Sequence, residues 1–225
     1  MKKLTKALAS IMLIVATLFV AGCEKEVSQP SNDWVDLGLP SGLLWATRNV
    51  GATSPEDYGD YFAWGETTPK NIYNWSTYRY CNGNGNELTK YCSYSDYGYD
   101  GYTDNLTILQ PGDDAATANY GGRTPTKDDW QELMNNTTGS PMTVNGVNGL
   151  CFTSSNGNSI FLPSAGFHWD DSLSYADSYG YYWSSSFNTG SPNFAWYFYF
   201  DSLNHGMNNY GYRIHGRTVR AVRQN

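Results

Sequence analysis

Residues 194–200 read FAWYFYF, and this stretch is the longest strand candidate in the chain. Successive side chains of a strand point to opposite faces, so the phenylalanines and Trp196 fall on one face, whereas Ala195 and the two tyrosines fall on the other. Because both faces carry large apolar side chains, both are expected to be covered by other parts of the protein. The sequence therefore predicts a central strand in the interior of a sheet.

Shorter strand candidates occur elsewhere in the chain, each bounded by Gly, Pro, Asn or Ser residues that favour turns. With 19 tyrosines and 8 tryptophans, large aromatic side chains are expected to fill much of the core. Some of them could instead stack on sugar rings, whose C–H faces complement aromatic planes. The shorter candidates are residues 42–46, 61–64, 149–153, 159–162, 181–185 and 218–222.

One helix is predicted over residues 127–136, KDDWQELMNN. Thr126 can cap its first turn, and Asp129 can complete a capping box with it. A shorter helical turn is predicted at residues 113–119, with Asp113 as its cap, and it ends before a pair of glycines. Few helices among many short strands indicate an α+β fold with long irregular loops. The apolar positions of the longer helix, spaced i, i+3 and i+4, are Trp130, Leu133 and Met134.

The N-terminal segment is typical of an exported lipoprotein. Lys2, Lys3 and Lys6 precede an apolar run at residues 7–21, which is short for a membrane span and suits a signal peptide. The VAGC sequence that follows matches a lipobox, in which the thiol of Cys23 accepts lipid before a peptidase cuts in front of it. Two or three acyl chains on one residue are enough for stable anchoring.

These features predict three segments, which are a signal peptide at 1–22, a lipid-anchored tether at 23–33 and one folded domain at 34–225. The predicted location is the outer membrane, on the cell surface. Removing the signal takes away 3 of 14 basic residues and none of the 21 acidic ones, which leaves a net charge of 11 − 21 = −10. Such a chain should repel nucleic acid and anionic membrane surfaces. Contact with the membrane is therefore predicted through the lipid anchor alone.

Six segments carry a family resemblance: VDLGLPSGLLWATRNVGA (35–52), YFAWGET (61–67), DDAATANYGGRTPTKDDWQELMNN (113–136), NGNSIFLPSAGF (156–167), YYWSSS (181–186) and GRTVRAVR (216–223). Together they resemble the Fibrobacter succinogenes major paralogous domain, FISUMP. That family is similar in turn to the fold of C-type lectins and of formylglycine-generating sulfatase-modifying factors, through an R-x-P-T-x-x-x-W pattern at Arg123, Pro125, Thr126 and Trp130. The resemblance implies an α+β domain with a twisted antiparallel sheet and long loops, and it supplies no activity.

An enzymatic role is disfavoured by the chemistry that it would need. The formylglycine-generating enzymes use a pair of reactive cysteines near the C-terminus, and residues 154–225 contain no cysteine. A serine hydrolase would be indicated by a G-x-S-x-G turn, and none is present. The three histidines, His168, His205 and His215, have no spacing that identifies a catalytic base.

Three cysteines remain after the lipidation site. Export places them in an oxidising compartment, and a bridge between Cys81 and Cys92 would close a polar, glycine-rich stretch and remove about 3 kcal/mol of unfolded-chain entropy. We therefore predict a Cys81–Cys92 disulfide. Cys151 lies between Leu150 and Phe152 in a strand candidate and is predicted to be a buried, inert thiol.

Acidic residues are frequent between Asp96 and Asp114, which raises the possibility of bound calcium. The run that begins at Asp96 departs from an EF-hand loop, because Gly98 replaces a ligand and Thr107 stands where the bidentate glutamate belongs. The sugar-binding E-P-N, Q-P-D and W-N-D motifs of calcium-dependent lectins do not occur in the sequence. We predict a solvated loop, with no metal site and no cofactor.

Two loops, 166–180 and 201–213, combine aromatic and hydrogen-bonding side chains, the mixture that a glycan site needs. The alternative is that these are ordinary turn residues whose aromatic rings fold inward. The predicted binding residues are Trp169, Tyr175, Asn208, Asn209, Tyr210, Arg213 and His215.

The predicted function is a lipid-anchored surface protein that binds or adheres to a glycan or a protein partner without catalysis. The alternative is a structural component of a surface assembly, and an enzyme of unknown type comes third.

Overall fold

The computed structural model describes residues 33–225, which belong to one compact unit. The predicted signal peptide, the lipid-accepting Cys23 and all but the last residue of the tether lie outside the described residues. Among the described residues no helix is long and apolar enough to cross a membrane.

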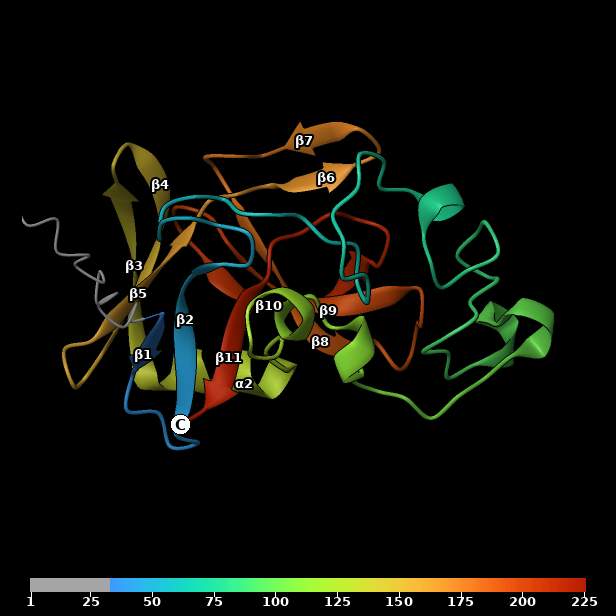
Figure 1. Cartoon of the computed structure of the whole chain (residues 1–225), viewed down its shortest axis with the longest axis horizontal. Coiled ribbons are helices and arrows are strands. Elements are labelled where there is room, and N and C mark those ends of the chain that lie inside the picture. The colour runs from blue at the N-terminus through green and yellow to red at the C-terminus, as the bar shows by residue number, and fades with distance from the viewer. Residues whose placement is uncertain (1–32) are drawn as a thin grey trace, which may run out of the picture. The chain divides into compact units, whose positions relative to one another are not determined.

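Antiparallel sheets and two short α-helices make up the described chain, which agrees with the predicted α+β class (Figure 1). The helices are α1 (Ala115–Asn119) and α2 (Lys127–Asn136), with short 3-10 turns at Trp75–Thr77, Ser95–Tyr97, Tyr99–Gly101 and Pro111–Asp113. The strands are β1 (Trp34–Asp36), β2 (Leu43–Asn49), β3 (Thr137–Val144), β4 (Val147–Ser154), β5 (Ser159–Pro163), β6 (Phe167–Trp169), β7 (Ser172–Ser174), β8 (Gly180–Phe187), β9 (Phe194–Phe200), β10 (His205–Tyr212) and β11 (Arg220–Gln224).

Strand β9 is central in the sheet β10-β9-β8, as predicted for residues 194–200. Its two neighbours are antiparallel to it, with Phe198 opposite Met207 on one side and Tyr182 on the other. The remaining sheets are β3-β4-β5, β1-β2-β11 and the hairpin β6-β7. The prediction that both faces of β9 are covered holds in part, because Phe198 is fully buried whereas Tyr197 and Tyr199 are only half-buried.

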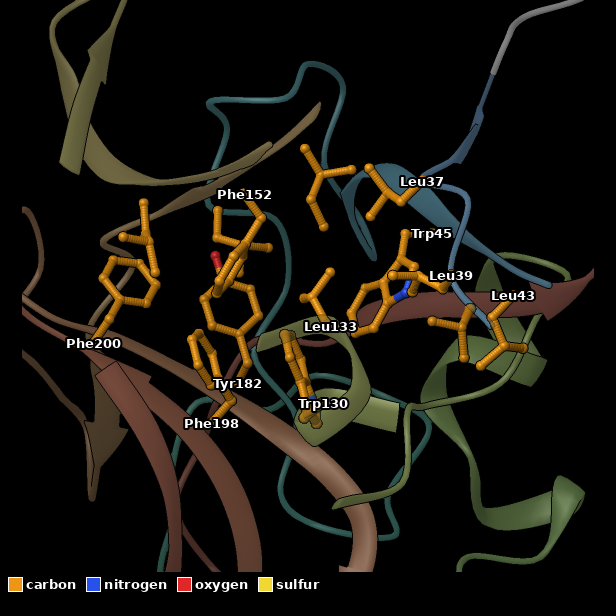
Figure 2. Packing of buried hydrophobic residues seen from close by; sticks show 14 residues of the cluster. Leu37, Leu39, Leu43, Trp45, Trp130, Leu133, Phe152, Tyr182, Phe198 and Phe200 are labelled. Carbon is orange, nitrogen blue, oxygen red and sulfur yellow. The ribbon is translucent and has the colours of Figure 1, made fainter. Parts of the chain in front are cut away.

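Helix α2 begins where the sequence predicted. The Thr126 side chain accepts a hydrogen bond from the Asp129 N–H, and the Asp129 carboxylate accepts one from the Thr126 N–H. The helix covers the sheet with Trp130, whose ring stacks on Phe198 at 4.7 Å and meets Trp45 edge-on at 4.8 Å (Figure 2). Helix α2 is therefore held by the burial of its aromatic side chain as well as by its cap.

The acidic segment differs from the prediction at its C-terminal end. The carboxylate that caps α1 is that of Asp114, which accepts from the Ala116 N–H, so the assignment of the cap to Asp113 was wrong. Asp113 is buried and accepts hydrogen bonds from Lys90 and from Tyr80 and Tyr91. These donors hold the pKa of Asp113 below its ordinary value against the opposing effect of burial. This end of the loop is part of the packed structure and is not solvated.

Two segments differ from the strands and loops that the sequence predicted. Residues 61–64 were predicted as a strand but form none, although Phe62 makes one isolated bridge with Arg217. The loop predicted at residues 201–213 instead contains strand β10. In this strand Gly211 allows the backbone to approach the side chains of the neighbouring strands closely. A Cβ at Gly211 would lie 2.7 Å from the ring of Tyr197 and 2.9 Å from that of Trp183. The strand therefore depends on tertiary fit, which intrinsic propensity does not capture.

Candidate binding surface

The sheet β10-β9-β8 has a second face, opposite to the one that α2 covers. Tyr181 pairs with Tyr199 and Trp183 with Tyr197, so these four side chains point to that second face. The Tyr181 ring stacks on Tyr179 with centroids 5.9 Å apart and lies 5.9 Å from the Tyr197 ring. The tyrosines are half-buried, so part of each ring reaches solvent. We call the following set the aromatic face: Phe167, Trp169, Tyr175, Tyr179, Tyr181, Tyr197 and Tyr199.

The hairpin β6-β7 extends this face with exposed rings. Phe167 and Trp169 are two residues apart in β6 and therefore lie on the same side. Phe167 meets Tyr181 edge-on at 5.1 Å and stacks on Tyr175 at 6.0 Å, which joins the hairpin to the sheet. Trp169 is 59% exposed and Tyr175 is 57% exposed. Both rings therefore reach solvent.

The backbone holds these two rings in place. Asp170, directly after Trp169, exchanges two main-chain hydrogen bonds with Tyr73, and its carboxylate accepts from Asn74. Both Asp170 and Tyr175 have positive φ, 51° and 60°. A tyrosine in the left-handed region is strained, and residues strained in this way cluster at active sites and ligand-binding sites.

A buried cation lies under the aromatic face. The guanidinium carbon of Arg217 is 3.6 Å from the centroid of the Tyr197 ring and 4.6 Å from that of Trp183. Arg217 is 3% exposed, and its Nε and Nη1 atoms have no hydrogen-bond partner among the described residues. Burial lowers its pKa to about 10, so it stays charged at neutral pH. None of the ion pairs found between residues 33 and 225 includes it.

His215 joins the hairpin to the C-terminal end of β10. Its ring centroid lies 5.0 Å from that of Phe167, 6.0 Å from Trp169 and 5.7 Å from Tyr212. Burial, with a smaller effect from the charge of Arg217, lowers the pKa of His215 to about 3. The imidazole is therefore neutral at physiological pH, and its Nδ1 has no hydrogen-bond partner among the described residues.

Of the predicted binding residues, Trp169, Tyr175 and His215 are brought together. Asn208 lies opposite Tyr197 in the sheet, and its side chain accepts from the Tyr210 N–H. The Asn209 carbonyl accepts from Asn188. Tyr210 is 67% exposed and packs on Phe194, and no ring contact joins it to Trp169 or Tyr175 among the described residues.

The prediction of Arg213 as a binding residue was wrong. It is 0% exposed, and its guanidinium donates to the main-chain carbonyls of Lys90 and Tyr91. Its Cζ also lies 4.8 Å from the centroid of the Trp64 ring, so its role is structural. The sequence prediction missed Arg217 instead, whose signal was its position directly before the strand candidate at residues 218–222.

The remaining side-chain predictions concern cysteines and metals. Cys81 and Cys92 are free thiols that donate to different carbonyls, those of Trp75 and Tyr94, and burial raises the pKa of both. Their disulfide stays a prediction. Cys151 is buried, as expected. Within residues 33–225, no group of three or more His, Cys, Asp and Glu side chains is arranged to hold a metal ion.

Comparisons with models of protein families, with curated proteins and with solved structures found no match for this chain. The resemblance to FISUMP and to the lectin-like fold therefore stays a prediction.

Proposed function

We propose that this protein is a lipid-anchored, non-catalytic surface protein that binds a glycan on its aromatic face. The observation that carries the proposal is the pair of exposed rings, Trp169 and Tyr175, on the side of the β6-β7 hairpin that adjoins the tyrosines of the sheet. An exposed group of neighbouring aromatic rings can mark an interaction site, and sugar C–H faces complement such rings.

Preorganisation of the rings supports the same function. The Tyr175 ring is held by Phe167 and Tyr179, and the Trp169 ring contacts His215. Rings that are already ordered lose little conformational entropy when a ligand binds. The neighbouring groups include hydroxyls, amides and a neutral imidazole, which suits hydrogen bonding to sugar hydroxyls. A glycan without charged groups should then bind with little dependence on salt.

We also propose that the α+β arrangement is of the C-type lectin-like type, within a FISUMP-type domain. Support comes from helix α2, which begins directly after the Arg123-to-Thr126 segment of the R-x-P-T-x-x-x-W pattern and buries its tryptophan against the sheet. Attachment to the outer membrane through Cys23 belongs to the same proposal and rests on the lipobox alone.

The test is a glycan array probed with a soluble form that begins at Ser31, together with Trp169→Ala and a matched control, Tyr94→Ala. Tyr94 is 53% exposed on a distant stretch of sequence, so its truncation removes a similar exposed ring outside the aromatic face. We expect discrete glycan hits that survive EDTA, weaken in Trp169→Ala and persist in Tyr94→Ala. A blank array would favour the structural component of a surface assembly, and equal loss in both variants would contradict the site.

A further inference from the structure

A hollow of about 620 Å³ lies between the sheet β3-β4-β5 and the end of the sheet β10-β9-β8. Its volume is in the range of pockets that hold small ligands. Five parts of the chain line it: Pro141–Thr143 of β3, Asn148 and Gly149 of β4, Ser164, the loop 177–179, and Phe200 of β9 with turn residues 201–203.

The side chains that line the hollow carry negative charge only. Asp177 and Asp201 line it, whereas no Lys, Arg or His does. One oxygen of each carboxylate supports the fold, because Asp177 Oδ1 accepts from the Asn148 N–H and Asp201 Oδ1 accepts from the main chain of the turn at Leu203. The second oxygen of each has no hydrogen-bond partner among the described residues. Two carboxylate oxygens are therefore available to a ligand.

Ser164 provides an independent indication of a ligand. It lines the hollow, it is 4% exposed, and its main chain is fully used, with its N–H donated to Asn148 and its carbonyl accepting from Asp177. No hydrogen bond of its hydroxyl is found within residues 33–225. The hydroxyl therefore keeps its donor and its acceptor positions for a ligand that enters the hollow.

The wall that carries Asp177 is rigid. Asp177 has φ of +64°, its N–H bonds to the Ser164 carbonyl at 2.6 Å, and its own carbonyl accepts from the Asn148 side chain. The carboxylate is therefore held at the hollow before any ligand arrives. Asparagine also tolerates the left-handed backbone, so an Asp-to-Asn change here removes charge with little strain.

Tyr179 connects the hollow to the aromatic face. It lines the hollow, and its ring contacts Tyr175 at 5.4 Å and stacks on Tyr181 at 5.9 Å. A ligand of more than one sugar unit that lies on the aromatic face can therefore continue into the hollow.

We propose that the hollow is a second subsite of the glycan site and that it binds the protonated amine of an amino sugar. An ammonium group carries three donors and one positive charge, which match the free oxygens of Asp177 and Asp201 and the hydroxyl of Ser164. Pro141 and Met142 add apolar surface for the sugar ring. This inference rests on the proposed glycan-binding function and names the class of glycan.

The test compares two probes of equal length, an oligomer of β-1,4-linked glucosamine and its fully N-acetylated counterpart. Calorimetric titration at mildly acidic pH keeps the amines of the probe protonated. We expect the protein to bind the amine form about tenfold more tightly, as a charge-assisted hydrogen bond allows. The preference should disappear as the pH rises and the amine loses its proton.

Three charge-removing variants test which carboxylates cause the preference for the amine form. Asp177→Asn and Asp201→Asn should each remove most of the preference, whereas Asp96→Asn makes the same change at an exposed site and should keep it. Equal loss in Asp96→Asn would reduce the effect to general charge attraction and overturn the inference. So would equal affinity for the two oligomers, failure to bind either one, or a preference that EDTA abolishes.

Failure of the inference is distinguishable from failure of the proposed function. Trp169→Ala should weaken both oligomers by a similar factor without changing the preference between them. Array binding that depends on Trp169, together with no amine preference, would retain the aromatic face and reject the hollow. Melting temperatures of all variants show whether any loss reflects unfolding.

Discussion

Two arginines three residues apart lie in regions of opposite character. Arg220, in β11, is fully buried, and each of its donor nitrogens is used, since Nε bonds to Asn49, Nη1 to the Ala46 carbonyl and Nη2 to the Phe161 carbonyl. Arg217 is also buried, but aromatic rings surround it and two of its nitrogens are unpaired among the described residues. Burial lowers the pKa of both to about 10. The hydrogen bonds around Arg220 stabilise the fold, whereas the region around Arg217 retains polar groups without partners among the described residues, beside an exposed surface.

The largest effect is expected at the satisfied arginine. Arg220→Met leaves three buried acceptors without donors, and each unsatisfied group costs on the order of 1 kcal/mol or more. We expect the free energy of unfolding to fall by about 3 kcal/mol, measured by urea denaturation. Arg223→Met in the same strand is the control, because Arg223 is exposed and stacks on Trp34. A loss no larger than that of the control would contradict the contrast between the two regions.

The second effect is a pH dependence of stability in the unsatisfied region. The pKa of His215 is about 3 in the folded protein against 6.5 as the ordinary value, because burial disfavours the charged ring. Above pH 6.5 both states are neutral at this site and its contribution to stability is complete. As the pH falls from 6.5 towards 3, the unfolded chain takes up a proton that the folded chain refuses, so stability is lost.

We expect this loss to be about 2 kcal/mol, since the ring is only partly buried. Urea denaturation across that pH range measures it. His215→Gln, which cannot be protonated, should flatten the profile. An unchanged slope in the variant would assign the acid sensitivity to other groups.

The third effect concerns binding and not stability. Trp169→Ala removes an exposed ring, so the melting temperature should change little, while affinity for a bound glycan should fall by about 1 kcal/mol. Calorimetric titration with a glycan identified on the array measures the affinity, and thermal unfolding of the same variant measures the melting temperature. A large fall in melting temperature would mean that Trp169 stabilises the hairpin, and binding lost in EDTA would indicate a metal.

The same contrast explains which parts of the structure the sequence could predict. Strand β9 and helix α2 follow from local periodicity and a cap, and both were predicted with the observed bounds. Strand β10 contains Gly206 and Gly211 and forms because β9 pairs with it, which no local pattern encodes. Trp169 was predicted because its loop combines aromatic and hydrogen-bonding side chains. Arginine burial depends on partners far away in sequence, and for that reason Arg213 was chosen and Arg217 was missed.

The smallest effect is expected at the unsatisfied arginine, and it tests the comparison most directly. Arg217→Met removes stacking on Tyr197 that is worth up to about 2 kcal/mol when desolvated. It also removes two buried donors without partners among the described residues, each of which costs about 1 kcal/mol or more. These terms nearly cancel, so the free energy of unfolding should change by less than about 1 kcal/mol in either direction. Methionine fits because it is apolar and adapts to irregular space. Urea denaturation beside Arg220→Met measures the difference between the two positions. Equal losses at both would show that Arg217 is as structural as Arg220, and that its two nitrogens find partners in the folded protein.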